Sequence, residues 1–262
     1  EKESSRRKLV EISNRKENIN KKPFGSTAIG RKRRVGIGNN NKSIKNAQTI
    51  KHKSEKQITY SLPLTITEEV KLCLQDVSKG DILSCVATTG LQSAFLYKSG
   101  KWAATGKILK EKLKKHKKAR YISLGTGGRY FIRLKSGRII WDGPNSMKKY
   151  LEGNLGIRCV AFGGNKDTFV VVYSDGSWKF EGSEIPPDLK EFLRSKGDCH
   201  DVSCVTMGPS GEWFLQVESG DIHLGGVSKK FENLCDTSIG KDRKTPHFVD
   251  FGKHGTFVIT YK

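Results

Sequence analysis

The chain has 262 residues, of which 35% are hydrophobic, and it carries a formal net charge of +21 at pH 7. The length is sufficient for one good hydrophobic core, but the sequence has no run of 18 apolar residues, which excludes a membrane-spanning helix and predicts no membrane partner. No secretory signal is visible, and three of the six cysteines are interpreted below as buried and unpaired. Both observations favour an intracellular, reducing compartment.

Residues 1–56 form a polar and strongly basic segment. They hold 17 lysines and arginines against five glutamates, and they contain one aromatic residue, Phe24. Such a segment buries too little apolar area to offset its ordering entropy. We therefore expect a tail that is intrinsically disordered alone or ordered by a partner.

The tail contains the basic run Arg31, Lys32, Arg33 and Arg34, followed by small residues and then by Lys42 and Lys45. Small residues let a backbone approach phosphates closely while the cationic side chains bridge them. With one aromatic residue, base stacking is not expected, so the predicted contact is to sugar and phosphate. A nuclear localisation signal, an acidic protein partner or a membrane surface are the alternative interpretations of this run.

Residues 57–262 are dominated by a repeat of about forty residues. Each copy has an apolar anchor, a turn with glycine and an aromatic-rich strand, and four copies add a second glycine turn and a third strand. A period of this size with several short strands predicts an array of β-sheet blades. The anchors are Val86, Ile122, Val160, Val205 and Val249.

One copy illustrates the unit. Residues 120–124 alternate as a strand, 129–135 form a second strand, and 138–141 form a third. The glycines between them occupy positions where a short hairpin needs a positive φ. Short helical patterns separate the units, at residues 67–75, 108–118, 146–151, 187–194 and 228–235.

The last copy stops before a third strand, and the missing strand is found near residues 57–62, which precede a helical pattern and the first anchor. The fold class is therefore predicted to be all-β: a five-bladed β-propeller of three-stranded blades with short helical linkers, closed by an N-terminal strand and preceded by the basic tail. Such radial closure protects strand edges. An open stack of hairpins is the alternative. The predicted blades span residues 83–107, 119–143, 157–182, 202–226, and 246–262 with 57–62.

The repeat resembles the β-propeller repeats of the regulator of chromosome condensation and of tectonin-type lectins. The resemblance covers about residues 57–262 and rests on phrases such as Val160-Ala161-Phe162-Gly163-Gly164 and Ser174-Asp175-Gly176-Ser177-Trp178. The chain departs from the first family in having five copies and helical linkers, and from the second in lacking a regular surface aromatic residue. The resemblance implies the fold, and neither family's function is transferred.

The linker of residues 107–120 holds eight basic residues and one acid, Glu111. As a helix it would bury Ile108, Leu109 and Leu113 and expose four lysines. A basic helix beside a basic tail predicts a nucleic-acid-binding face, and a solvated helix surface is the alternative. The four lysines are Lys110, Lys114, Lys117 and Lys118.

No catalytic constellation, cofactor motif or metal site is predicted. Cys85, Cys159 and Cys204 directly precede repeat anchors, and they are interpreted as small buried residues too far apart to pair. Cys199 and His200 lack a second close pair of zinc ligands. Three tryptophans recur near one position of the third strand and are interpreted as blade packing, with a sugar or peptide platform as the alternative. They are Trp102, Trp141 and Trp178.

These patterns predict a non-enzymatic scaffold subunit of a nucleic-acid-containing assembly, with RNA or DNA bound through the phosphate backbone and protein subunits bound by the propeller. The nucleus or a ribosome-containing compartment or organelle would suit such a protein. A propeller that recognises a peptide or a glycan, as an adaptor or a lectin does, is the alternative hypothesis.

Overall fold

A computed structural model of the chain describes residues 48–50, 58–61, 81–89, 91–116, 118–152, 156–197, 200–242 and 244–261. The strands are β1 (Gln48–Ile50), β2 (Ile58–Ser61), β3 (Leu83–Thr88), β4 (Ser93–Tyr97), β5 (Trp102–Ala104), β6 (Ala119–Leu124), β7 (Tyr130–Leu134), β8 (Ile139–Asp142), β9 (Ile157–Phe162), β10 (Phe169–Tyr173), β11 (Trp178–Glu181), β12 (Val202–Met207), β13 (Trp213–Val217), β14 (Ile222–Gly225), β15 (Pro246–Gly252) and β16 (Thr256–Tyr261). The helices are α2 (Lys107–Lys115), α3 (Lys148–Leu151), α4 (Pro187–Ser195) and α5 (Lys229–Cys235).

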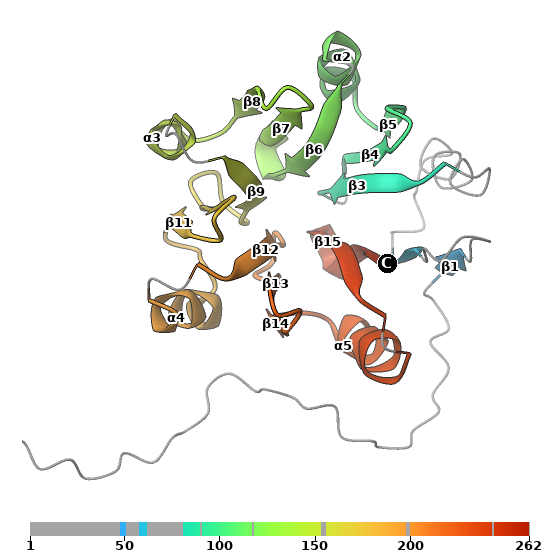
Figure 1. Ribbon diagram of the computed structural model, residues 1–262, viewed down its shortest axis with the longest axis vertical. Coiled ribbons are helices and arrows are strands. Elements are labelled where there is room, and N and C mark those ends of the chain that lie inside the picture. The colour runs from blue at the N-terminus through green and yellow to red at the C-terminus, as the bar shows by residue number, and fades with distance from the viewer. Residues whose placement is uncertain are drawn as a thin grey trace, which may run out of the picture.

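Within the described residues, the strands form five small antiparallel sheets in a propeller-like, all-β arrangement around a common centre (Figure 1). Four sheets have three strands, β3-β4-β5, β6-β7-β8, β9-β10-β11 and β12-β13-β14, and the fifth has four strands in the order β15-β16-β2-β1. The helices lie at the periphery, between one sheet and the next (Figure 1). None of the helices in the described segments is long and apolar enough to cross a bilayer.

The fifth sheet joins strands from distant parts of the chain. Strand β2 pairs antiparallel with β16, with Tyr60 opposite Val258, which confirms the predicted partnership of the N-terminal strand with the last copy. Strand β1 then adds to the outer side of β2. Gln48–Ile50 were predicted to belong to the tail, since three residues carry no turn or repeat signal of their own. Their pairing with β2 defines them as a strand.

The five repeat anchors are buried on the first strands of the sheets, β3, β6, β9, β12 and β15, which we call the inner strands. Consecutive inner strands contact one another, and β15 in turn contacts β3. These strands lie nearest the centre of Figure 1. The apolar anchors therefore form the core where the sheets meet.

A recurring hydrogen bond joins each inner strand to the next. A side chain beside the anchor of one strand donates to the anchor carbonyl of the following strand. The pairs are Cys85 Sγ to Ile122 O (3.4 Å), Tyr121 Oη to Val160 O (3.2 Å), Cys159 Sγ to Val205 O (3.9 Å) and Thr206 Oγ1 to Val249 O (2.9 Å). Between β15 and β3 the bond reverses its direction, since the Thr88 N–H donates to Asp250 Oδ2 at 2.6 Å.

The glycine that follows an inner strand has a different role from the one predicted. Gly125 and Gly208 do not adopt a positive φ. A Cβ on Gly125 would lie 2.8 Å from Cβ of Phe162, and a Cβ on Gly208 would lie 2.8 Å from Cβ of Phe251. Both phenylalanines belong to the next inner strand, so the glycine leaves room for the neighbouring sheet. The glycines of the second turns do have positive φ, as predicted: Gly100, Gly137, Gly176 and Gly220.

The tryptophans of the third strands pack within the sheets, as the sequence predicted. Trp102, Trp141 and Trp178 are partly buried on β5, β8 and β11 and contact the adjacent apolar clusters. Cys85, Cys159 and Cys204 are unpaired thiols, as predicted; Cys85 and Cys159 are buried and Cys204 is partly buried. Cys235 is a further unpaired and buried thiol.

Replacing Thr206 by Val tests the bond between inner strands. The variant keeps the shape of the side chain but leaves the buried carbonyl of Val249 without this donor, so we expect a loss of about 1 kcal/mol in the free energy of unfolding. Chemical denaturation measures it. Thr206→Ser keeps the hydroxyl but loses the buried methyl group, so it measures the packing contribution separately; a Val variant as stable as the wild type would show that the bond contributes nothing.

Candidate nucleic-acid interface

Helix α2 carries the predicted basic face. Leu109 and Leu113 are buried against the sheet, and their i,i+4 spacing places both on one side of the helix. Ile108 was predicted to be buried with them, but it is 64% exposed. It is one residue, or about 100° of helix rotation, away from Leu109, so it falls at the edge of the buried stripe.

The predicted lysines occupy the side of this region that faces solvent. Lys114 and Lys118 are exposed, and Lys110 is partly buried. Lys110 and Lys114 lie one helical turn apart on α2, and Lys118 precedes β6. The remaining predicted binding residues lie outside the described residues: Arg31, Lys32, Arg33, Arg34, Lys42, Lys45 and Lys117.

The structure adds cations that the sequence analysis did not single out. The hairpin between β7 and β8 carries exposed Lys135 and Arg138, and the Lys135 N–H donates to the carbonyl of Lys118 at 2.8 Å. Exposed Lys115 completes the group at the end of α2. We call these residues the basic surface: Lys110, Lys114, Lys115, Lys118, Lys135 and Arg138.

A second hairpin extends the charge on the neighbouring sheet. Lys98 and Lys101 flank the turn between β4 and β5, and both are exposed. The Lys98 N–H donates to the carbonyl of Ile82 at 2.8 Å, just before β3, as Lys135 does just before β6. Because the two inner strands are equivalent, both hairpins lie at the same end of their sheets.

A local charge count would have found this surface from sequence. Residues 98–138 contain fourteen lysines and arginines and a single acid, Glu111. Residues 139–261 contain fourteen lysines and arginines against seventeen acids. The excess positive charge of the repeat region therefore belongs to the sheets β3-β4-β5 and β6-β7-β8 and the helix between them.

Several arginines of the same region serve the fold instead. Arg129 is buried, lies over the ring of Phe162 and donates to the carbonyl of Gly163 at 2.8 Å, so it connects the second sheet to the third. Arg133 donates to the carbonyl of Ile157 and lies over the ring of Tyr121. These guanidinium groups are already bonded, and they are not counted in the basic surface.

Several cations in the rest of the described chain are paired with acids. Lys149 contacts Glu181 at 3.0 Å, and the hydrogen bond between them raises the pKa of Lys149 and lowers that of Glu181. Arg158 contacts Glu218 at 2.7 Å, and Lys196 contacts Asp201 at 2.8 Å. The sheets β3-β4-β5 and β6-β7-β8 therefore carry the excess of positive charge, whereas acids balance the cations in the rest of the ring.

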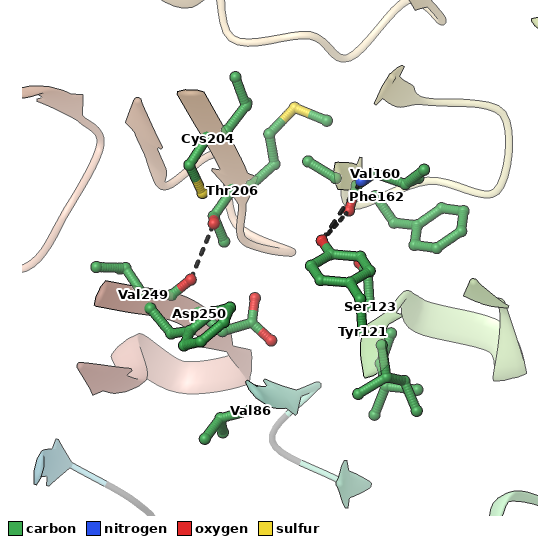
Figure 2. A pocket seen from close by; sticks show the side chains of 15 residues that line it. Val86, Tyr121, Ser123, Val160, Phe162, Cys204, Thr206, Val249 and Asp250 are labelled. Atoms are coloured by element: carbon green, nitrogen blue, oxygen red, sulfur yellow. Dashed lines mark hydrogen bonds between the residues drawn. The ribbon is translucent and has the colours of Figure 1, made fainter. Parts of the chain in front are cut away.

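The inner strands enclose a cavity of about 20 Å³ at the centre, which has room for about one water molecule. Figure 2 shows the hydroxyl of Tyr121 directed at Val160, that of Thr206 at Val249, and the carboxyl of Asp250 in the space between them. Burial raises the pKa of Asp250 well above its usual range, although N–H groups of Thr88 and Phe251 oppose the shift. The cavity is too small for an organic substrate.

Two of the cysteines beside the anchors come closer together than predicted. The thiols of Cys159 and Cys204 interact, which lowers the pKa of Cys159 and raises that of Cys204. The reason is that inner strands converge at the centre, so equivalent positions on β9 and β12 are near neighbours. Among the described residues, no three His, Cys, Asp or Glu side chains are grouped to hold a metal ion.

The comparisons with known proteins leave the family open. No family model matches the sequence, and no curated protein matches it. Among solved structures, the chain resembles YCF48 bound to D1 peptide (10% identity, 54% of this chain and 49% of that one, TM-score 0.31). It also resembles the C-terminal domain of gp131 from bacteriophage phiKZ (10% identity, 68% and 50%, TM-score 0.26). The chain matches about half the length of each of these chains, and at these TM-scores the similarity carries no functional argument.

Replacing Asp250 by Asn tests the buried carboxyl. Because the folded-state pKa is raised, the wild-type chain loses stability as the pH rises above about 4, where the carboxyl ionises in the unfolded chain. The amide carries no charge but keeps an oxygen that accepts from Thr88. We expect the variant to gain about 1 kcal/mol or more at pH 7 and little near pH 4.

Denaturation curves across this pH range measure the difference. Exposed Asp142 at the end of β8 supplies the control Asp142→Asn, for which no such gain is expected. A deficit of the Asp250 variant that grows as the pH rises toward 7 would mean that the ionised carboxylate stabilises the contact between β15 and β3.

Proposed function

We propose that the chain is a non-enzymatic scaffold subunit of a nucleic-acid-containing assembly, and that it binds the phosphate backbone of RNA or DNA through its basic surface and its basic tail. The observation that carries the proposal is the concentration of exposed cations on α2 and the adjoining hairpin, in a segment with one acid. Clustered lysines and arginines attract a phosphate backbone and release its counterions.

We also propose a closed five-bladed β-propeller as the framework of this surface. The contact of β15 with β3 and the pairing of β2 with β16 support this closure. In such a framework each blade is held by its two neighbours, so the loops and hairpins keep fixed relative positions. The basic surface would then be rigid, and the opposite side of the ring would be free to bind protein subunits in a nuclear or ribosome-containing compartment.

The basic surface makes a specific prediction about charge. The double variant Lys114→Glu/Lys118→Glu should weaken binding to a structured RNA or a duplex DNA at least about tenfold at about 50 mM salt, and it should flatten the dependence of affinity on salt up to about 200 mM. Fluorescence polarisation with labelled oligonucleotides measures both quantities.

The matched control is Lys166→Glu/Lys179→Glu, which makes the same change in net charge at exposed positions of the third sheet. If both double variants bind alike, net charge and not the basic surface controls binding. If the wild-type chain binds neither polymer, or binds without dependence on salt, the proposed function is wrong and a peptide or glycan ligand becomes the better hypothesis.

The contribution of the tail is tested by removing residues 1–47. This deletion keeps β1, which pairs with β2 and therefore belongs to the fifth sheet. We expect the salt dependence to become shallower as the tail cations are lost. An unchanged affinity and an unchanged salt dependence would assign all phosphate contacts to the sheets and α2.

A further inference from the structure

His116 occupies the junction between α2 and the hairpin cations. It is the C-terminal cap residue of α2, where its N–H donates to the carbonyl of Lys112 at 2.9 Å, and it is partly buried. Two residues further on, the carbonyl of Lys118 accepts from Lys135. This bond brings the hairpin that carries Arg138 alongside the end of the helix.

Positive groups surround this histidine. Burial, followed by the charges of Lys115, Arg138 and Lys112, lowers the pKa of His116 below its usual range. Lys112 and Lys115 belong to its own helix, and Arg138 reaches it from the β7–β8 hairpin. Lys118 follows two residues after His116 in the chain, and its carbonyl accepts from the Lys135 N–H of the same hairpin. The one acid of this segment, Glu111, is exposed on α2 and does not offset this field at the imidazole.

We propose that His116 is a proton-linked phosphate contact of the basic surface: it is neutral in the free chain and takes up a proton when a nucleic-acid phosphate binds there. This inference rests on the proposed function. A phosphate placed among these cations supplies the negative charge that the protonated imidazole lacks, and a protonated imidazole offers two N–H donors to phosphate oxygens. The site is thus a pH-dependent part of the interface.

Thermodynamic linkage between proton binding and nucleic-acid binding determines how the affinity changes with pH. A group that binds a proton more tightly in the complex than in the free chain makes the complex stronger as the pH falls. One linked proton changes the affinity by up to about tenfold for each pH unit. The effect should be largest over the interval between the depressed pKa of the free histidine and its higher pKa in the complex.

The experiment measures affinity for the same RNA hairpin and DNA duplex from about pH 5.5 to about pH 8 at constant ionic strength. The wild-type chain should bind more tightly at low pH. His116→Gln should lose most of that dependence. His116→Arg, which carries a permanent charge, should bind tightly at every pH in the range.

The control is His200→Gln. His200 is exposed in the segment before β12, where its Nδ1 lies 3.5 Å from Asp175 Oδ2, so its replacement should leave the pH dependence unchanged. A titration of the His116 ring proton signals by NMR gives a second measurement, and its pKa should rise when the oligonucleotide is added.

The outcomes separate this inference from the proposed function. If the wild-type chain binds neither polymer at any pH, the proposed function fails. If the wild-type chain binds, but His116→Gln retains the full pH dependence or the pKa of His116 does not rise on binding, the proton-linked contact is refuted and the phosphate-binding surface stands.

Discussion

The side-chain bond to the next anchor carbonyl is the interaction on which the rest of this structure depends. Each sheet has three or four short strands and cannot bury its hydrophobic face on its own. Its inner strand gains partners on both sides through buried apolar anchors and through bonds such as that of Tyr121 to Val160. The positions of the hairpins and linker helices in the described parts of the chain follow from this central packing.

The repeat allowed much of the fold to be predicted, because strand alternation, glycine turns and anchors all have the same period. Helix α4 and the pairing of β2 with β16 followed from that period. Features that depend on contacts between copies could not be obtained in this way. Three such features arise from neighbours that are distant in sequence. They are the room that Gly125 leaves for Phe162, the proximity of Cys159 to Cys204, and the pairing of β1 with β2.

The candidate site was predictable in part for a similar reason. Helical periodicity identified Lys110 and Lys114, which lie on one element, whereas Lys135 and Arg138 join them only through the hairpin bond to Lys118. Periodicity also does not distinguish a cation that faces solvent from one that stacks on an aromatic ring, as Arg129 does on Phe162. Three-dimensional context, more than residue type, decides which charges can meet a phosphate.

The fifth sheet has a consequence for how the chain is made. Strand β2 leaves the ribosome roughly 200 residues before β16, its partner on the inner side, and at ordinary translation rates this delay is on the order of 10–40 s. Throughout that interval the edge of β2 that faces β16 lacks its final partner, a condition that favours pairing with foreign strands. A nascent chain of this design would benefit from a chaperone that covers this edge until β16 has been made.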